Sequence, residues 1–206
     1  MKHLISGAFL ALAAALVSVT ITAQQPLAGP PSPDVAGPRF TPAGELIRPD
    51  DFREWMFVTS GLGMTYNQPT GAPRTPSFTN VYVNPPAYRT FMKTGQWPDK
   101  TMFILEVRAS TSEGSINKGG HFQSNLIVVE ASVKDEARYP GKWAYFDFGR
   151  DMKPQVAALA TTERCYACHG ENGAVDNTFV QFYPTLFDVA KKLGTLKPAF
   201  ASAAHH

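Results

Sequence analysis

The chain has 206 residues, with 19 lysines and arginines against 17 aspartates and glutamates, and its formal net charge is +2. It contains no basic block, which argues against a nucleic-acid partner and against binding to an anionic membrane surface. Aromatic residues make up 12% of the sequence and include 14 phenylalanines. This supply suits an aromatic core or a large apolar pocket, and the length suits one domain.

The first 23 residues predict a secretory signal peptide. Met1–His3 carry positive charge, Leu4–Val19 are almost entirely apolar, and Ile21–Ala23 have the character of a cleavage site. The apolar run is shorter than the roughly 20 residues of a membrane helix, although an uncleaved anchor stays open as an alternative. We therefore expect Sec-type export to the periplasm. Residues 24–43 are rich in proline and glycine and are expected to form a linker.

The domain is expected to span residues 44–198 and to contain long strands. A short helix is predicted from Pro49, followed by a loop rich in glycine and proline over 61–76. Strands are predicted over 78–84, 101–109, 122–133 and 143–148, and helices over 85–94, 151–160 and 179–193, the last with a break or a start at Pro184. Consecutive strands with helices at the ends predict an α+β fold, mostly antiparallel β-sheet with flanking helices.

The stretch Cys165-Tyr166-Ala167-Cys168-His169 has the pattern C-x-x-C-H, the attachment motif of a c-type haem. The two thiols would bond to the haem vinyl groups, and His169 would be the proximal iron ligand. These are the only two cysteines in the chain, so none remains for a disulfide. The motif predicts one covalent haem c, in a C-terminal attachment segment. Export agrees with this prediction, because haem c is attached outside the bacterial cytoplasm.

Two other interpretations of the cysteine pair have less support. A redox dithiol is expected where a strand leads into a helix, and the surrounding sequence does not suggest that arrangement. A zinc site would need a second pair of ligands. His121 lies far upstream, and His205 and His206 lie at the end of the chain.

Several further stretches of the sequence have recognisable patterns besides the haem motif. They are Phe52–Trp55, Val81–Tyr88 with Lys93–Gly95, Ala131–Asp135, Trp143–Gly149, and Cys165–His169 with Glu171–Asn172. In this order they resemble the cytochrome P-460 family, which includes the β-type cytochromes c′. The similarity covers roughly residues 45–193. It implies an antiparallel sheet with flanking helices, a homodimer, and one five-coordinate haem c with an open distal side.

The resemblance also separates two functions. The P-460 members oxidise hydroxylamine, and they carry a lysine bonded to the haem macrocycle together with a distal carboxylate. The lysine position corresponds here to Leu105, and the carboxylate position to Ala131, with Glu130 as the one-residue alternative. Ala131 is preferred because it alternates with Ile127 and Val129, and a shift of one residue would turn the side chain to the other face. On this alignment the distal pocket has neither the nucleophile nor the acid.

The expected function is therefore that of a β-type cytochrome c′, the binding of nitric oxide or another neutral diatomic gas in an apolar pocket. Hydroxylamine oxidation is the alternative. Candidates for an aromatic cap over the gas are Phe57, Phe78, Phe103 and Phe122, with Phe103 and Phe78 preferred, although each also suits packing in the core of the sheet.

A third hypothesis is plain electron transfer with a redox partner cytochrome. An axial methionine would favour it, and Met92, Met102 and Met152 are available.

Some residues carry weaker hypotheses. Lys93 could supply a cross-link from a neighbouring helix, but a lysine also suits a helix C-terminus. His121 could be a sixth iron ligand or a surface residue. Arg164 could pair with a haem propionate or remain exposed. Candidates for pocket or dimer contacts are Glu54, Tyr88 and Tyr183.

Overall fold

The structure is a computed structural model, and it describes residues 37–65 and 75–202. The signal peptide predicted over residues 1–23 and most of the predicted linker lie outside the described residues. Within the described ranges, no helix has both the length and the hydropathy that crossing a membrane requires.

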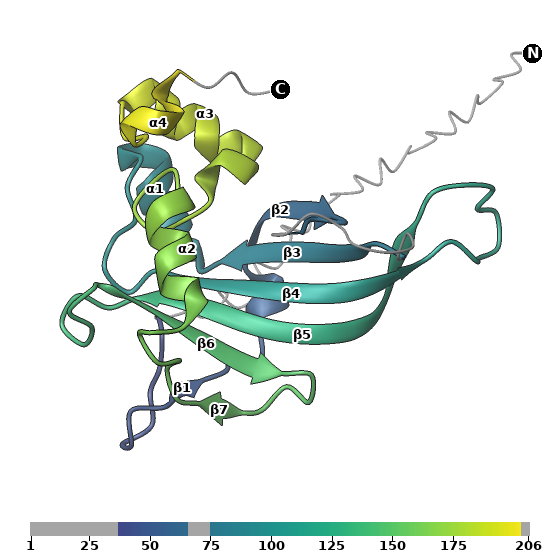
Figure 1. The fold of residues 1–206 in the computed structure, drawn as a ribbon, viewed down its shortest axis with the longest axis horizontal. Coiled ribbons are helices and arrows are strands. Elements are labelled where there is room, and N and C mark those ends of the chain that lie inside the picture. The colour runs from purple at the N-terminus through teal and green to yellow at the C-terminus, as the bar shows by residue number, and fades with distance from the viewer. Residues whose placement is uncertain (1–36, 66–74, 203–206) are drawn as a thin grey trace, which may run out of the picture. The chain divides into compact units, whose positions relative to one another are not determined.

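Five antiparallel strands form the main sheet, and they are arranged in the order of the chain (Figure 1). They are β2 (Met56–Leu62), β3 (Ser77–Val83), β4 (Met102–Thr111), β5 (Phe122–Lys134) and β6 (Trp143–Gly149). The short strands β1 (Leu46–Ile47) and β7 (Gln155–Val156) pair with each other in a second, two-stranded sheet. The predicted α+β class with a mostly antiparallel sheet is confirmed.

The helices are short, and three of them gather at one end of the sheet (Figure 1). They are α1 (Pro85–Thr94), α3 (Pro184–Leu193) and α4 (Pro198–Ala201). The helix α2 (Arg164–Asn172) lies over the sheet. Two further segments, η1 (Phe52–Glu54) and η2 (Val180–Phe182), are short 3₁₀ helices. Proline begins α1 and α3, where a missing N–H costs nothing. Gly95 and Gly194 end these two helices with φ of 69° and 68°, a conformation that glycine adopts without strain.

Each face of the sheet buries its own apolar cluster. On one face Val83, Phe103 and Tyr145 pack with side chains of α1 and α3, including Phe91 and Leu186. On the other face a second cluster includes Leu46, Phe52, Ile104, Ala131 and Phe146. Residues of β4 therefore alternate between two apolar environments, as a strand buried on both faces must.

Two predicted helices are wrong. The helix predicted from Pro49 shortens to η1, because Trp55 is already extended, with ψ of 175°, and leads into β2. The helix predicted over 151–160 does not form. Gly149 turns the chain with φ of 72°, and the carbonyl of Pro154 then accepts a hydrogen bond from the Arg48 N–H, which places β7 beside β1. Proline has no N–H to continue a helix.

The remaining predicted strands and helices agree with the structure within a few residues, and residues 66–74 of the predicted loop lie outside the described residues. The region predicted as a helix over 179–193 divides at Tyr183, and α3 begins at Pro184 as one of the two options anticipated. β2 was missed, because its sequence Met-Phe-Val-Thr-Ser-Gly-Leu runs into the region predicted as a loop.

A buried carboxylate anchors β4 to β3 and η1. Glu106 is 2% exposed, and its Oε1 accepts hydrogen bonds from Arg53 Nη2 at 2.6 Å and Arg108 Nη2 at 3.0 Å. Its Oε2 accepts a hydrogen bond from Asn80 Nδ2 at 3.3 Å. Burial alone would raise the pKa of Glu106, but the hydrogen bonds from Arg108, Arg53 and Asn80 outweigh burial and lower the pKa. The carboxylate therefore stabilises the fold in its ionised form.

We expect Glu106→Gln to lower the free energy of unfolding by about 2 kcal/mol at neutral pH, since it removes a charge from a buried pair. Because the folded pKa of Glu106 is lowered, this contribution is present above the unfolded pKa and is lost as pH falls through the folded value. Urea unfolding at several pH values measures it. Asp50→Asn is the control: Asp50 pairs with Arg48 at 2.8 Å but its side chain is 88% exposed, so its loss should cost less than about 0.5 kcal/mol. Equal costs for the two variants would contradict the prediction.

Candidate functional site

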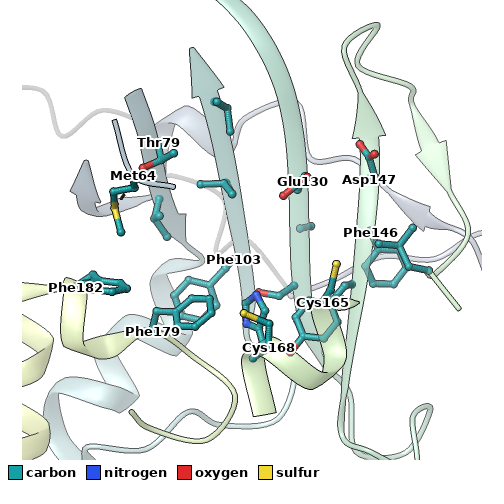
Figure 2. Close-up of a pocket in the computed structure, with 18 of the residues that line it drawn as sticks. Met64, Thr79, Phe103, Glu130, Phe146, Asp147, Cys165, Cys168, Phe179 and Phe182 are labelled. Carbon is teal, nitrogen blue, oxygen red and sulfur yellow. Dashed lines mark hydrogen bonds between the residues drawn. The ribbon is translucent and has the colours of Figure 1, made fainter. Parts of the chain in front are cut away.

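A cavity of about 670 Å³ lies between the main sheet and the segment that carries the haem motif. Figure 2 shows Phe103, Glu130 and Asp147 on the strands, with Cys165 and Cys168 beside the same space. Lining residues come from β2 to β6 and from the region between Leu159 and Tyr183. The cavity is therefore assembled from distant parts of the sequence.

The floor of the cavity is a row of side chains that crosses the sheet. The strand registers pair Val81 with Leu105, Leu105 with Glu130, and Glu130 with Asp147. Directly paired residues in antiparallel strands project to the same face. All four line the cavity. The row thus passes from apolar side chains on β3 and β4 to two carboxyl groups on β5 and β6.

This register corrects the prediction that the pocket lacks an acid. Ala131 shares a face with Val129, as expected, but that face is the one of Ile104, with which Ala131 pairs. Ala131 borders the cavity, while its neighbour Glu130 pairs with Leu105 and contributes the carboxyl group. Alternation within β5 groups its residues into two faces, but only the pairing with β4 shows which face meets the cavity.

The surroundings of Glu130 disfavour its ionised form. Burial raises the pKa of Glu130, and the nearby carboxylate of Asp147 raises it further. Asp147 is exposed, and its Oδ1 accepts a hydrogen bond from the Gly149 N–H at 2.7 Å. The two carboxyl groups therefore differ in environment, one buried in the cavity and one in contact with solvent.

The helix α2 presents the motif residues to the cavity. Cys165, Cys168 and His169 all line it, and both cysteines are free thiols. Burial raises the pKa of the Cys165 thiol, with a smaller contribution from Glu130, so the thiol form is favoured. Cys168 and His169 are adjacent, and Cys165 lies one helical turn earlier, so one face of a short helix holds two sulfurs and one imidazole together.

His169 is held in one tautomer by the backbone. Its Nδ1 lies 2.8 Å from the carbonyl oxygen of Asn177, and because a carbonyl only accepts, Nδ1 carries the proton. Its ring lies between those of Tyr145 and Phe179, each with a centroid distance of 4.4 Å. Burial lowers the pKa of His169, against a smaller opposite effect of the Asn177 hydrogen bond. A neutral imidazole with an unprotonated Nε2 is the form that binds a metal.

Of the four predicted cap phenylalanines, the structure brings only one to the cavity. Phe103 lines it, whereas Phe78 pairs with Arg108 on the opposite face, and Phe57 and Phe122 are exposed. Phe179 and Phe182 line the cavity as well and were not predicted as cap residues. Both stand a few residues after the haem motif, where the sequence offered only a helical apolar pattern.

The weaker hypotheses divide in a similar way. Arg164 and Tyr183 line the cavity, so a propionate partner and a pocket residue stay possible at these positions. The other candidates do not line the cavity. Lys93, His121 and Glu54 are exposed, and Tyr88 packs against the apolar cluster of Val83 and Phe91. Met92, Met102 and Met152 lie elsewhere, whereas Met64, which was not predicted from the sequence, lies beside Thr79 in the cavity wall.

The comparison with known families decides the identity. The sequence description of the family Cytochrome P460 matches residues 49–180, which is more than half of the chain. The chain belongs to the cytochrome P460 family. No curated protein matches it. Membership in this family makes the protein a haem cytochrome, and it confirms the resemblance drawn from the motif phrases.

The residues of this cavity fit a haem. Its volume of about 670 Å³ falls within the range of cofactor sites, and its walls combine apolar side chains with a few polar ones. The two thiols and the neutral imidazole stand at one side of it. These donors match the covalent and axial bonds of a c-type haem.

We expect Glu130→Gln to make the protein more stable than the wild type at neutral and alkaline pH. Because the folded pKa of Glu130 is raised, the wild type keeps its full stability below the unfolded pKa and loses part of it as pH rises through the folded pKa. The variant has no carboxylate to desolvate. Urea unfolding from acid to alkaline pH measures the difference, with Glu113→Gln on an exposed loop as the control. A difference between wild type and Glu130→Gln that does not change with pH would contradict it.

Proposed function

We propose that the cytochrome carries one covalent haem c, bonded through Cys165 and Cys168, with His169 as the proximal ligand. The support is the position of these three residues on one helix beside the cavity, and the neutral tautomer of His169. A haem held there would supply an iron with a position for a further ligand. Met92, Met102 and Met152 do not line the cavity, whereas Met64 does, beside Thr79.

We further propose that the open position binds nitric oxide or another neutral diatomic gas. The observation that carries this proposal is Leu105, which lines the cavity between Val81 and Glu130 where a cross-linking lysine would be needed. Phe103 and Val107 extend the same apolar surface along β4. The apolar part of the floor, on β3 and β4, disfavours charged and strongly hydrated ligands, because burying such groups without partners is costly.

Oxidation of hydroxylamine or a related nitrogen compound is the second candidate, and Glu130 is the observation that favours it. A carboxyl group with a raised pKa, lining the cavity, is better suited to hold and return a proton than an ordinary carboxylate. In a gas-binding protein the same group would donate a hydrogen bond to the bound ligand. Glu130 is thus compatible with both functions, whereas Leu105 favours gas binding.

The cellular setting is proposed from the sequence alone. The signal peptide predicted over residues 1–23 supports export to the periplasm, and the family resemblance supports a homodimer. Electron exchange with a partner cytochrome would return the iron to its starting oxidation state between ligand-binding cycles.

The reduced protein should have the spectrum of an ordinary five-coordinate ferrous haem c, and the spectrum should change when nitric oxide or carbon monoxide is added. The intact mass should equal the chain plus one haem, without loss of hydrogens. Cys165→Ala with Cys168→Ala should abolish covalent haem while leaving the fold. A strongly red-shifted Soret band with missing hydrogens would show a lysine cross-link and make the enzyme the better hypothesis. A six-coordinate low-spin spectrum would instead favour electron transfer.

Leu105→Lys tests whether position 105 separates the two functions. The lysine would enter the cavity from β4, in the row that meets Glu130. With hydrogen peroxide added as the two-electron oxidant, we expect a lysine N–H and a macrocycle C–H to be replaced by an N–C bond, detectable as a loss of two hydrogens in the intact mass. Leu105→Ile keeps the volume and has neither a nucleophile nor an iron ligand, so it should give the ordinary haem c spectrum. If the lysine variant binds haem normally and forms no bond, the assignment of position 105 is wrong. In the same background, Glu130→Gln should lower any hydroxylamine turnover by about 10²–10⁴-fold.

A further inference from the structure

A tight loop follows α2 and supplies the carbonyl that holds His169. It spans residues 173–178, and the Thr178 N–H donates to the carbonyl of Val175 at 3.0 Å. Gly173 is needed at its start, since a Cβ there would lie 2.7 Å from the Thr178 backbone nitrogen. Asp176 has φ of 55°, a left-handed conformation that a non-glycine residue keeps only where its surroundings hold it.

One anchor of this loop is a buried lysine at the end of β5. The Lys134 side chain is 10% exposed, and its Nζ donates to Asp176 Oδ2 at 2.9 Å. The same Nζ donates to the carbonyl of Trp97 at 2.8 Å. A lysine this deeply buried is costly unless it is paired, so the position of Asp176 is strongly favoured.

The second anchor is the indole of Trp97. Its Nε1 donates to Thr178 Oγ1 at 2.8 Å, and that hydroxyl donates in turn to the carbonyl of Val175 at 2.7 Å. Trp97 is stacked on Phe91 at a centroid distance of 4.0 Å and meets Phe103 edge-on at 4.8 Å. The indole is therefore held rigidly, and its hydrogen bond fixes the loop relative to the sheet and α1.

The two anchors hold the residues on either side of Asn177. Lys134 binds Asp176 and Trp97 binds Thr178, while the Asn177 carbonyl between them accepts from His169 Nδ1 at 2.8 Å. We propose that Lys134 and Trp97 are positioning residues that fix this carbonyl and thereby set the orientation and the electron donation of the proximal histidine. Lys134 lies in the sequence stretch Ala131–Asp135 that contributes to the family resemblance. The haem motif alone does not account for this stretch, and the proposed role accounts for its lysine.

The chemical consequence follows from ligand basicity. A firm Nδ1–H···O hydrogen bond makes an imidazole a stronger donor through Nε2, and second-shell partners of this kind tune metal sites substantially. Weakening it should weaken the iron–histidine bond and raise the reduction potential. This inference rests on the proposed ligation by His169, but it does not depend on which gas or substrate binds on the other side.

The test compares Lys134→Met and Trp97→Phe with the wild-type holoprotein. Lys134→Met removes the ammonium donor and keeps an unbranched aliphatic side chain, and Trp97→Phe removes the indole N–H and keeps an aromatic ring. In the ferrous protein we expect the iron–histidine stretching band in resonance Raman to move to lower frequency and the reduction potential to rise. Amide exchange over residues 173–178 should become about tenfold faster. Lys134→Arg retains the charge and should restore most of the wild-type band.

Two control variants separate positioning from general loss of stability. Lys118→Met removes an exposed lysine between β4 and β5 that does not contact the loop. Ser110→Ala removes a buried hydroxyl bonded to the Pro76 carbonyl at 2.5 Å, at the end of β4 away from Trp97. Neither should move the band. The inference is overturned if the controls shift it as much as the test variants, or if the test variants loosen the loop and leave the band unchanged. A wild-type protein without any iron–histidine band would instead refute the proposed ligation.

Discussion

The register between β4 and β5 sets what the cavity contains. Leu105 pairs with Glu130, and this pairing places an apolar side chain and a carboxyl group side by side on the face that meets α2. A slip of one residue would bring Ala131 to that face and bury Glu130 among Ile104 and Phe146. Such a slip would be expensive, because it would place an unpaired carboxylate in an apolar cluster. The same pairing therefore secures the fold and determines the chemistry of the site.

The two glutamates of the central strands show how one sheet places like groups in different roles. Glu106 faces the side opposite the cavity, where two arginines and an asparagine keep its pKa low and make it a structural anchor. Glu130 faces the cavity, where burial and the carboxylate of Asp147 raise its pKa. Residue type alone does not separate these roles. The partners on each face of the sheet do, through hydrogen bonds in one case and desolvation in the other.

The proximal side depends on the backbone as much as on side chains. α2 presents two thiols and an imidazole, but the imidazole owes its tautomer to the carbonyl of Asn177, eight residues later. That loop is tied to β5 through Lys134 and to the segment after α1 through Trp97. The distal side, by contrast, is the face of a strand pair, where side chains can change without moving the backbone.

The sequence by itself determined the C-x-x-C-H motif, the family and strands β3 to β6, because these depend on local patterns: the spacing of Cys165, Cys168 and His169, and alternation along each strand. It did not determine β2, or β1 and β7, which pair with each other from distant parts of the chain, because strand pairing outweighs weak local preferences. Nor did it decide between Ala131 and Glu130, since alternation defines two faces without telling which one meets the cavity. Only the tertiary structure decided that, together with the roles of Phe179, Asn177 and Trp97, because each depends on how segments fold against one another and not on a local sequence pattern.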